Sequence, residues 1–190
     1  MARWEPNARL RLVRAAIDLF AEQGYDSTTV AEIAERAGLT KTTFFRYFPD
    51  KREVLFAGQE HHTRLFADGI AAAPEGATPL EAVAVALETA TAAFTPEQRS
   101  FGPQLQAVIE ANGELRERSV FKMMSISAAT TEALRKRGVP EPTADVAAYL
   151  GALAFDRAWA RWISLPGDPS FPELAREELQ ALRAATANLG

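Results

Sequence analysis

The 190-residue sequence contains no cysteine, and its two histidines are adjacent at His61 and His62. Without cysteine there are no disulfides, no thiolate nucleophiles and no cysteine-based zinc sites. Neighbouring helical side chains point about 100° apart, and no second pair of ligands follows at helical spacing, so the histidines do not predict a metal site. A glycine-rich phosphate-binding loop is also missing. We therefore expect no enzyme, no metal and no cofactor.

Long apolar runs are absent as well. No segment approaches the roughly 20 apolar residues that cross a bilayer, and the first residues lack the apolar core of a signal peptide. These absences predict a cytoplasmic protein that does not bind membranes. The net charge is −4, yet Lys and Arg outnumber Asp and Glu by nine to seven over residues 1–52. The N-terminal end is therefore where a nucleic acid would bind.

Apolar residues recur at helical spacing along the chain, and no segment alternates as a strand would. The first 50 residues predict three helices: one over residues 9–23, a second that ends at Gly38, and a third over residues 41–48. Thr29 and Glu32 have the spacing of a capping box at the start of the second helix. A fourth helix is expected from Lys51 to about Ala73, and five more follow between proline and glycine breaks. The chain is therefore expected to be all-α, with about nine helices.

The second and third helices are joined by the short connection of residues 37–40. Glycine at position 38 suits a tight reversal, and such a connection sets two short helices near a right angle, as in a helix-turn-helix. Leu39, Phe44 and Phe48 are expected to point inward. The outward face would then carry cations, hydroxyls and aromatic rings, namely Lys41, Thr42, Thr43, Phe45, Arg46 and Tyr47. These groups suit phosphates, base edges and thymine methyls in a major groove.

Plainer interpretations remain open for this segment. A helical hairpin that only packs would bury all four aromatic side chains of residues 44–48. Thr40 fits a simple helix cap, and Lys51 fits a solvated lysine. The whole chain could also be a helical ligand-binding or scaffold protein whose DNA-binding module has lost its function. Exposure of Phe45 and Tyr47 distinguishes the first of these from a DNA-binding surface.

Residues 28–51, TTVAEIAERAGLTKTTFFRYFPDK, resemble the signature of the tetracycline-repressor (TetR) family, and residues 19–25, LFAEQGY, resemble the end of that family's first helix. One departure is Phe45, where many members carry a tyrosine whose hydroxyl reaches a phosphate. The resemblance implies DNA contacts from eight residues: Thr29, Lys41, Thr42, Thr43, Phe45, Arg46, Tyr47 and Lys51.

The resemblance also implies two domains, a helix-turn-helix DNA-binding domain over residues 1–50 and a helical ligand-binding and dimerisation domain over residues 51–190. Such a protein is a transcriptional regulator that binds a palindromic operator as a homodimer. We expect a repressor that a small apolar or amphipathic effector releases from double-stranded operator DNA.

A ridge of small residues lies along the predicted eighth helix: Ala147, Gly151, Ala154 and Ala158. Pairing this ridge, together with Leu179 and Leu182 of the last helix, with a second copy would form a four-helix bundle around a two-fold axis. Packing of the ridge within one chain is the alternative.

The resemblance implies that the last two helices dimerise and that a ligand pocket lies beside the fourth helix. Aromatic and methionine side chains could line such an apolar cavity. The candidates are Phe66, Phe94, Phe101, Phe121, Met124, Phe155, Trp159 and Trp162. Each of them could equally belong to an ordinary core. Asp156, Arg157 and Arg161 could anchor a ligand or bridge two subunits.

Overall fold

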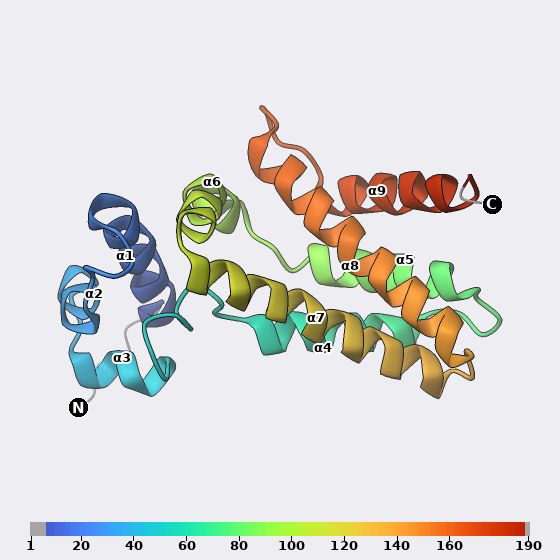
Figure 1. Cartoon of the computed structure of the whole chain (residues 1–190), viewed down its shortest axis with the longest axis horizontal. Coiled ribbons are helices and arrows are strands. Elements are labelled where there is room, and N and C mark those ends of the chain that lie inside the picture. The colour runs from blue at the N-terminus through green and yellow to red at the C-terminus, as the bar shows by residue number, and fades with distance from the viewer. Residues whose placement is uncertain (1–6, 189–190) are drawn as a thin grey trace. The chain divides into compact units, whose positions relative to one another are not determined.

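The computed structural model describes residues 7–188, and these residues form nine α-helices and no strand (Figure 1). The helices are α1 (Ala8–Gln23), α2 (Val30–Arg36), α3 (Lys41–Tyr47), α4 (Gln59–Ala72), α5 (Pro79–Thr91), α6 (Pro96–Ala111), α7 (Gly113–Lys136), α8 (Glu141–Ser164) and α9 (Phe171–Thr186). The all-α prediction is confirmed. None of the described helices is both long and apolar enough to cross a membrane.

The starts of α2 and α3 are built as the sequence predicts. Thr29 Oγ1 accepts a hydrogen bond from the Glu32 backbone amide at 3.3 Å, and Glu32 Oε2 accepts one from the Thr29 amide at 2.7 Å. Thr40 Oγ1 caps α3 by accepting from the Thr43 amide at 3.1 Å. Between the two helices, Gly38 has a φ of +66°, which glycine adopts without steric cost.

The fourth helix begins later than its sequence pattern indicates. The expected start at Lys51 is wrong, because residues 51–58 form turns and α4 begins at Gln59. Three consecutive residues inside this segment are buried, namely Val54, Leu55 and Phe56. Consecutive residues of a helix point about 100° apart, so a single helix face cannot bury all three. Gly58, at a φ of +91°, then leads into α4.

Packing divides the described residues into two units. Unit 1 comprises residues 7–57 and Phe101–Ser119, and unit 2 comprises Gly58–Ser100 and residues 120–188. Consequently α6 and α7 each have one part in unit 1 and the other in unit 2. The division into functional domains at residue 50 stays a prediction, because compactness does not assign function.

The core of unit 1 fixes which side of α3 faces inward. Phe44 is completely buried and Phe48 nearly so, with their ring centroids 5.5 Å apart. They pack in one cluster with apolar residues of the neighbouring helices, including Leu12, Ile33 and Leu115, each of which has no exposed surface. The predicted inward face of α3 is therefore confirmed.

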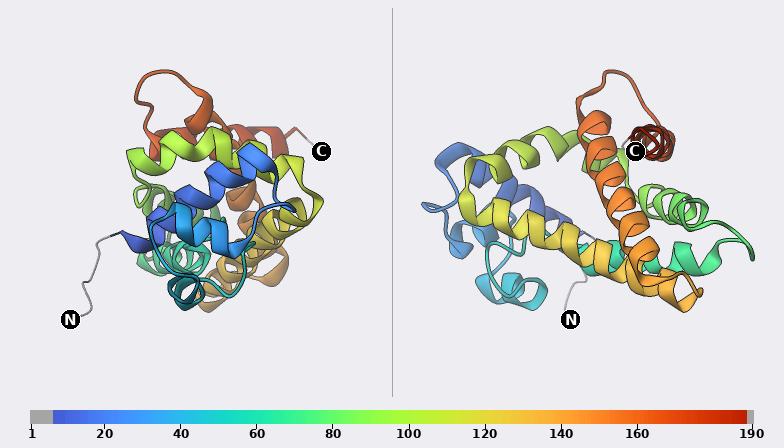
Figure 2. Two further views of the ribbon diagram at one scale, coloured as in Figure 1. Left: turned by 90° about the vertical axis from the view of Figure 1, so that its left-hand side faces the viewer. Right: turned by 45° about the vertical axis from the view of Figure 1, so that its right-hand side comes forward.

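In unit 2, α5 packs against α4, α8 and α9, and α9 turns back beside α8 (Figure 2). Two glycines permit close approaches. A Cβ atom at Gly69 of α4 would lie 2.5 Å from Ala86 Cα of α5, and one at Gly151 of α8 would lie 2.6 Å from Val83 Cγ1. The small residues of α4 and α8 therefore set how closely these helices approach α5.

Candidate functional site

The outward face of α3 is open to solvent. Phe45 is 49% exposed and Tyr47 is 38% exposed. Lys41, Thr42 and Arg46 are also exposed, and Thr43 is half-buried. The alternative in which all four aromatic side chains of residues 44–48 belong to a core is therefore wrong.

Each cation of this face lies near an exposed ring. Lys41 Nζ is 5.9 Å from the centroid of the Phe45 ring, and Arg46 Cζ is 5.2 Å from the centroid of the Tyr47 ring. Within residues 7–188 neither cation forms an ion pair with a carboxylate. Their charges therefore remain available to an anion such as a phosphate.

The two flanking residues of the predicted DNA-binding set are placed differently. Thr29 is exposed, and its hydroxyl donates to Glu32 Oε2 at 2.7 Å. Lys51 is half-buried, and its Nζ donates to the backbone carbonyls of Tyr25 and Thr28 at 2.7 and 3.1 Å. Lys51 Nζ also lies 4.2 Å from the centroid of the Tyr25 ring. Lys51 thus holds the turn before α2, which is not the role of a merely solvated lysine.

Five of the eight side chains expected to line a cavity come together in unit 2: Phe66, Phe94, Phe155, Trp159 and Trp162. Phe94 is central, with its ring centroid 5.9 Å from that of Phe155 and 5.6 Å from that of Trp159. The rings pack directly on one another, as side chains of an ordinary core do.

Two further members of this aromatic cluster were not predicted. His62 is buried and stacks on Phe94 with ring centroids 4.5 Å apart, and Phe171 stacks on Trp162 at 4.7 Å. His61 is exposed, and its ring centroid lies 5.9 Å from that of His62. No group of three potential metal ligands occurs among residues 7–188.

The other three expected cavity residues lie elsewhere. Phe101 belongs to the core of unit 1, because that part of α6 packs with α1–α3 rather than with unit 2. Phe121 and Met124 are 60% and 57% exposed on the solvent side of α7. The structure therefore does not bring these three to the aromatic cluster.

The ridge of small residues on α8 packs within the chain. Its members, Ala147, Gly151, Ala154 and Ala158, are buried, as is Leu179, and Leu182 is half-buried against the same core. This is the arrangement of the intrachain alternative, because small side chains let α8 approach α5. The exposed apolar residues of α8 lie on its other side: Val146, Tyr149 and Leu153 are 58%, 62% and 45% exposed.

The polar residues of α8 bind α9. The carboxylate of Glu178, 5% exposed, accepts from Arg157 Nε at 2.6 Å and from Arg161 Nη1 at 2.9 Å. Burial raises the pKa of this carboxyl, but the two guanidinium groups outweigh burial and hold the pKa below its ordinary value. Arg157 and Arg161 thus join α8 to α9, whereas Asp156 is exposed.

A groove of about 410 Å³ lies between α4 and α7 in unit 2. It is open to solvent and lined by Gln59, Glu60, Thr63, Arg64, Ala67, Ser125 and Ala129. Gln59 Oε1 is buried and accepts no hydrogen bond within the described part of the chain. The groove therefore combines methyl groups, the guanidinium group of Arg64, the carboxylate of Glu60 and a buried acceptor.

The two short helices α2 and α3 are joined by a tight reversal at Gly38, and α3 exposes its outward face to solvent. This arrangement is a helix-turn-helix. Residues 12–57 match the family described as "Bacterial regulatory proteins, tetR family". The regulator TcmR of Streptomyces glaucescens is 39% identical over 75 residues, which are 40% of this chain and 33% of TcmR. BetI of Rhizobium meliloti is 34% identical over 96 residues, 49% of this chain and 47% of BetI. The chain thus matches less than half the length of each.

Solved structures extend the likeness in fold to almost the whole chain. A putative transcriptional regulator from Pseudomonas aeruginosa has a TM-score of 0.63 at 15% identity, with 98% of this chain and 94% of that chain covered. FadR from Bacillus subtilis, in complex with stearoyl-CoA, has a TM-score of 0.57 at 19% identity, with 91% and 96% covered. The same arrangement of helices is thus found in these two solved structures.

Residues 12–57 thus match the N-terminal family model of the TetR regulators, and the solved structures show that the rest of the chain shares a fold with proteins of this kind.

Proposed function

We propose that the chain regulates transcription by inserting α3 into the major groove of operator DNA. The main support is the difference between the two faces of α3. Phe44 on the inward face is completely buried, whereas Phe45 and Tyr47 on the outward face are exposed. Lys41 lies near the Phe45 ring and Arg46 near the Tyr47 ring. A helix that only packed would gain nothing from exposing two rings to water. A recognition helix uses such groups for phosphates, guanine edges and thymine methyls.

The flanking residues extend this surface. Thr42 and Thr43 supply hydroxyls on α3, and Thr29 supplies one at the start of α2. In this proposal Lys51 acts twice, holding the turn before α2 through two backbone carbonyls and adding positive charge near a phosphate. Phe45 contributes an apolar contact in place of a phenolic hydrogen bond.

The test begins with in vitro selection of duplexes that the full chain binds. On a selected duplex, the Arg46→Ala/Tyr47→Ala variant is expected to bind at least about tenfold more weakly, with a salt slope lower by about one phosphate contact. The matched control is Arg135→Ala, which removes an exposed cation from the far end of α7. Unchanged affinity in the double variant, or no salt-dependent binding by the wild type, refutes the proposal. The second outcome favours a helical ligand-binding or scaffold protein.

We propose that the regulator is a homodimer that binds a palindromic operator. One side of α8 exposes three apolar side chains at helical spacing, Val146, Tyr149 and Leu153. Contact of such an apolar patch with water is unfavourable, and exposed patches of this kind often mark a protein–protein interface. A second copy seated on this face would bury an apolar, self-complementary surface.

A charged residue within that face should separate the subunits. Tyr149→Asp is expected to sediment as a monomer, whereas Leu165→Asp, which changes an exposed apolar residue in the loop after α8, is expected to stay dimeric. A dimeric Tyr149→Asp variant places the interface elsewhere, and a monomeric wild type refutes the homodimer.

We propose that an amphipathic effector binds beside α4 and releases the repressor from its operator in the cytoplasm. The groove between α4 and α7 supports this site, because about 410 Å³ suits a small molecule and its lining is both apolar and polar. Arg64 would contact an anionic head group, and Gln59 Oε1 would accept a hydrogen bond. The similar fold of FadR holds stearoyl-CoA, a ligand with an apolar chain and a charged head.

Anilinonaphthalene sulfonate, an amphipathic anion, serves as a probe of the groove. Its fluorescence should rise on binding to the wild type and much less with Ala129→Trp, which fills the groove from α7. The control Ala128→Trp adds the same ring at an exposed neighbouring position. Equal fluorescence of the two variants refutes this location of the site.

A further inference from the structure

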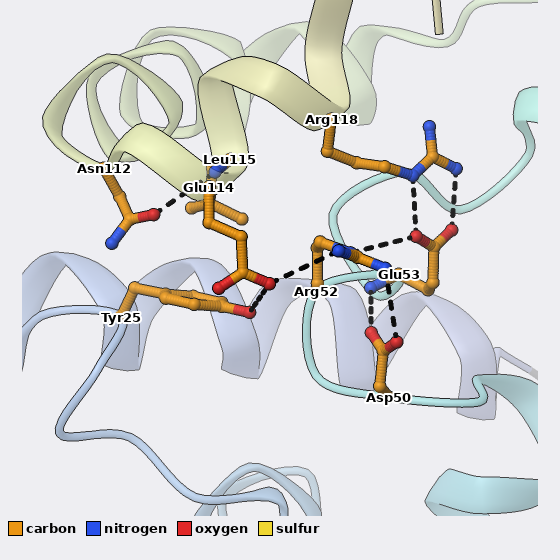
Figure 3. A network of polar contacts seen from close by, with 8 residues as sticks. All are labelled: Tyr25, Asp50, Arg52, Glu53, Asn112, Glu114, Leu115 and Arg118. Atoms are coloured by element: carbon orange, nitrogen blue, oxygen red, sulfur yellow. Dashed lines mark hydrogen bonds and ion pairs between the residues drawn. The ribbon is translucent and has the colours of Figure 1, made fainter. Parts of the chain in front are cut away.

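The first two turns of α7 carry charged side chains that bind the segments on either side of the helix-turn-helix (Figure 3). Arg118 donates from Nε to Glu53 Oε1 at 2.6 Å and from Nη2 to Glu53 Oε2 at 2.7 Å. The two side chains are only 14% and 22% exposed. Such a two-point contact fixes both distance and orientation. Arg118 therefore ties α7 to the turn that follows α3.

A second connection leads to the turn before α2. Glu114 Oε1 accepts hydrogen bonds from Tyr25 Oη and from Arg52 Nη1, each at 3.4 Å (Figure 3). Tyr25 is 7% exposed. Burial is the main cause that raises the pKa of Tyr25, and the nearby carboxylates of Glu114 and Asp50 raise the pKa further. The Tyr25 hydroxyl therefore stays protonated and remains a donor. Both ends of the helix-turn-helix are therefore bound to the same short stretch of α7.

The start of α7 is itself firmly placed. Asn112 Oδ1 accepts from the Leu115 amide at 3.2 Å, and Leu115 has no exposed surface in the core of unit 1. The connecting residues lie outside the exposed face of α3, which spans residues 41–47. Their contacts with one another therefore bear on how α2 and α3 are oriented.

We propose that Tyr25, Arg52, Glu53, Glu114 and Arg118, here called the α7 anchor, are positioning residues that orient the recognition helix for DNA. This inference rests on the proposed DNA-binding function. The same helix would also carry the response to a ligand, because α7 continues unbroken from the anchor to Ser125 and Ala129, which line the groove. A ligand in that groove contacts the same helix that holds both ends of the helix-turn-helix.

The test measures affinity for a selected duplex under conditions where circular dichroism shows each variant fully folded. Arg118→Gln and Glu53→Gln are each expected to bind roughly 3- to 30-fold more weakly, the range typical of residues that couple sites without touching the ligand. Their salt slopes should equal that of the wild type, because neither residue contacts a phosphate. The double variant should cost no more than the larger single effect, because the two residues act through one contact.

Arg116→Gln is the matched control, since it removes an exposed arginine from the same turns of α7 and should leave affinity unchanged. Tyr25→Phe is a gentler second variant that removes only the hydroxyl donated to Glu114, and it should also weaken binding. Wild-type affinity in both Arg118→Gln and Tyr25→Phe overturns the inference, as does a lowered salt slope. If the wild type itself does not bind DNA, the proposed function fails instead.

Discussion

Replacing Phe44 and Phe45 with alanine, one at a time, separates packing from DNA binding within two adjacent residues. Phe44 has no exposed surface, so Phe44→Ala leaves a cavity and should lower the free energy of unfolding by about 3–5 kcal/mol. Phe45 keeps 49% of its surface exposed. Since full burial of such a side chain contributes about 1.5–3 kcal/mol and only about half of Phe45 is buried, Phe45→Ala should cost at most about 1.5 kcal/mol.

Hydrogen exchange followed by mass spectrometry measures this difference in unit 1. Amides of α1 should exchange more than about a hundredfold faster in Phe44→Ala, because each 1.4 kcal/mol corresponds to about a factor of ten. In the Phe45→Ala variant, the α1 amides should exchange at nearly the wild-type rate, yet the variant should bind the selected duplex more weakly. Equal destabilisation by the two substitutions would refute the assignment of opposite faces to these neighbours.

Two further predictions concern stability. Hydrogen bonds from Arg118 lower the pKa of Glu53, so their stabilisation is complete above the ordinary glutamate pKa of about 4.3 and is lost as pH falls through the lowered value. On acidification, the free energy of unfolding measured in urea should therefore fall less for Glu53→Gln than for the wild type. An equal fall in both proteins would contradict this prediction. Gly69→Ala should cost about 1–3 kcal/mol in urea, because its Cβ would meet the backbone of α5, whereas Gly113→Ala should not destabilise.

Local sequence signals were sufficient for the helix-turn-helix. The caps at Thr29 and Thr40, the reversal at Gly38 and the two faces of α3 each depend on residues within a few positions of one another. The start of α4 was missed because the sequence alone does not show that Val54, Leu55 and Phe56 are all buried, which depends on packing partners elsewhere in the chain.

Contacts between distant segments could not be predicted in the same way. The small residues of α8 correctly indicate a close approach, but the sequence does not say whether the partner is α5 of the same chain or a second copy. Arg118 and Glu53 are 65 positions apart, and nothing local pairs them. The aromatic cluster likewise needed the fold to bring Phe171 to Trp162.

The most direct test of the central claim is a chemical footprint of the full chain on a selected duplex. The account predicts two protected major-groove segments on one face of the DNA, about 10 base pairs apart, both lost in the Arg46→Ala/Tyr47→Ala variant. Protection that survives this variant, or that lies outside the major groove, would contradict the claim that α3 enters the DNA.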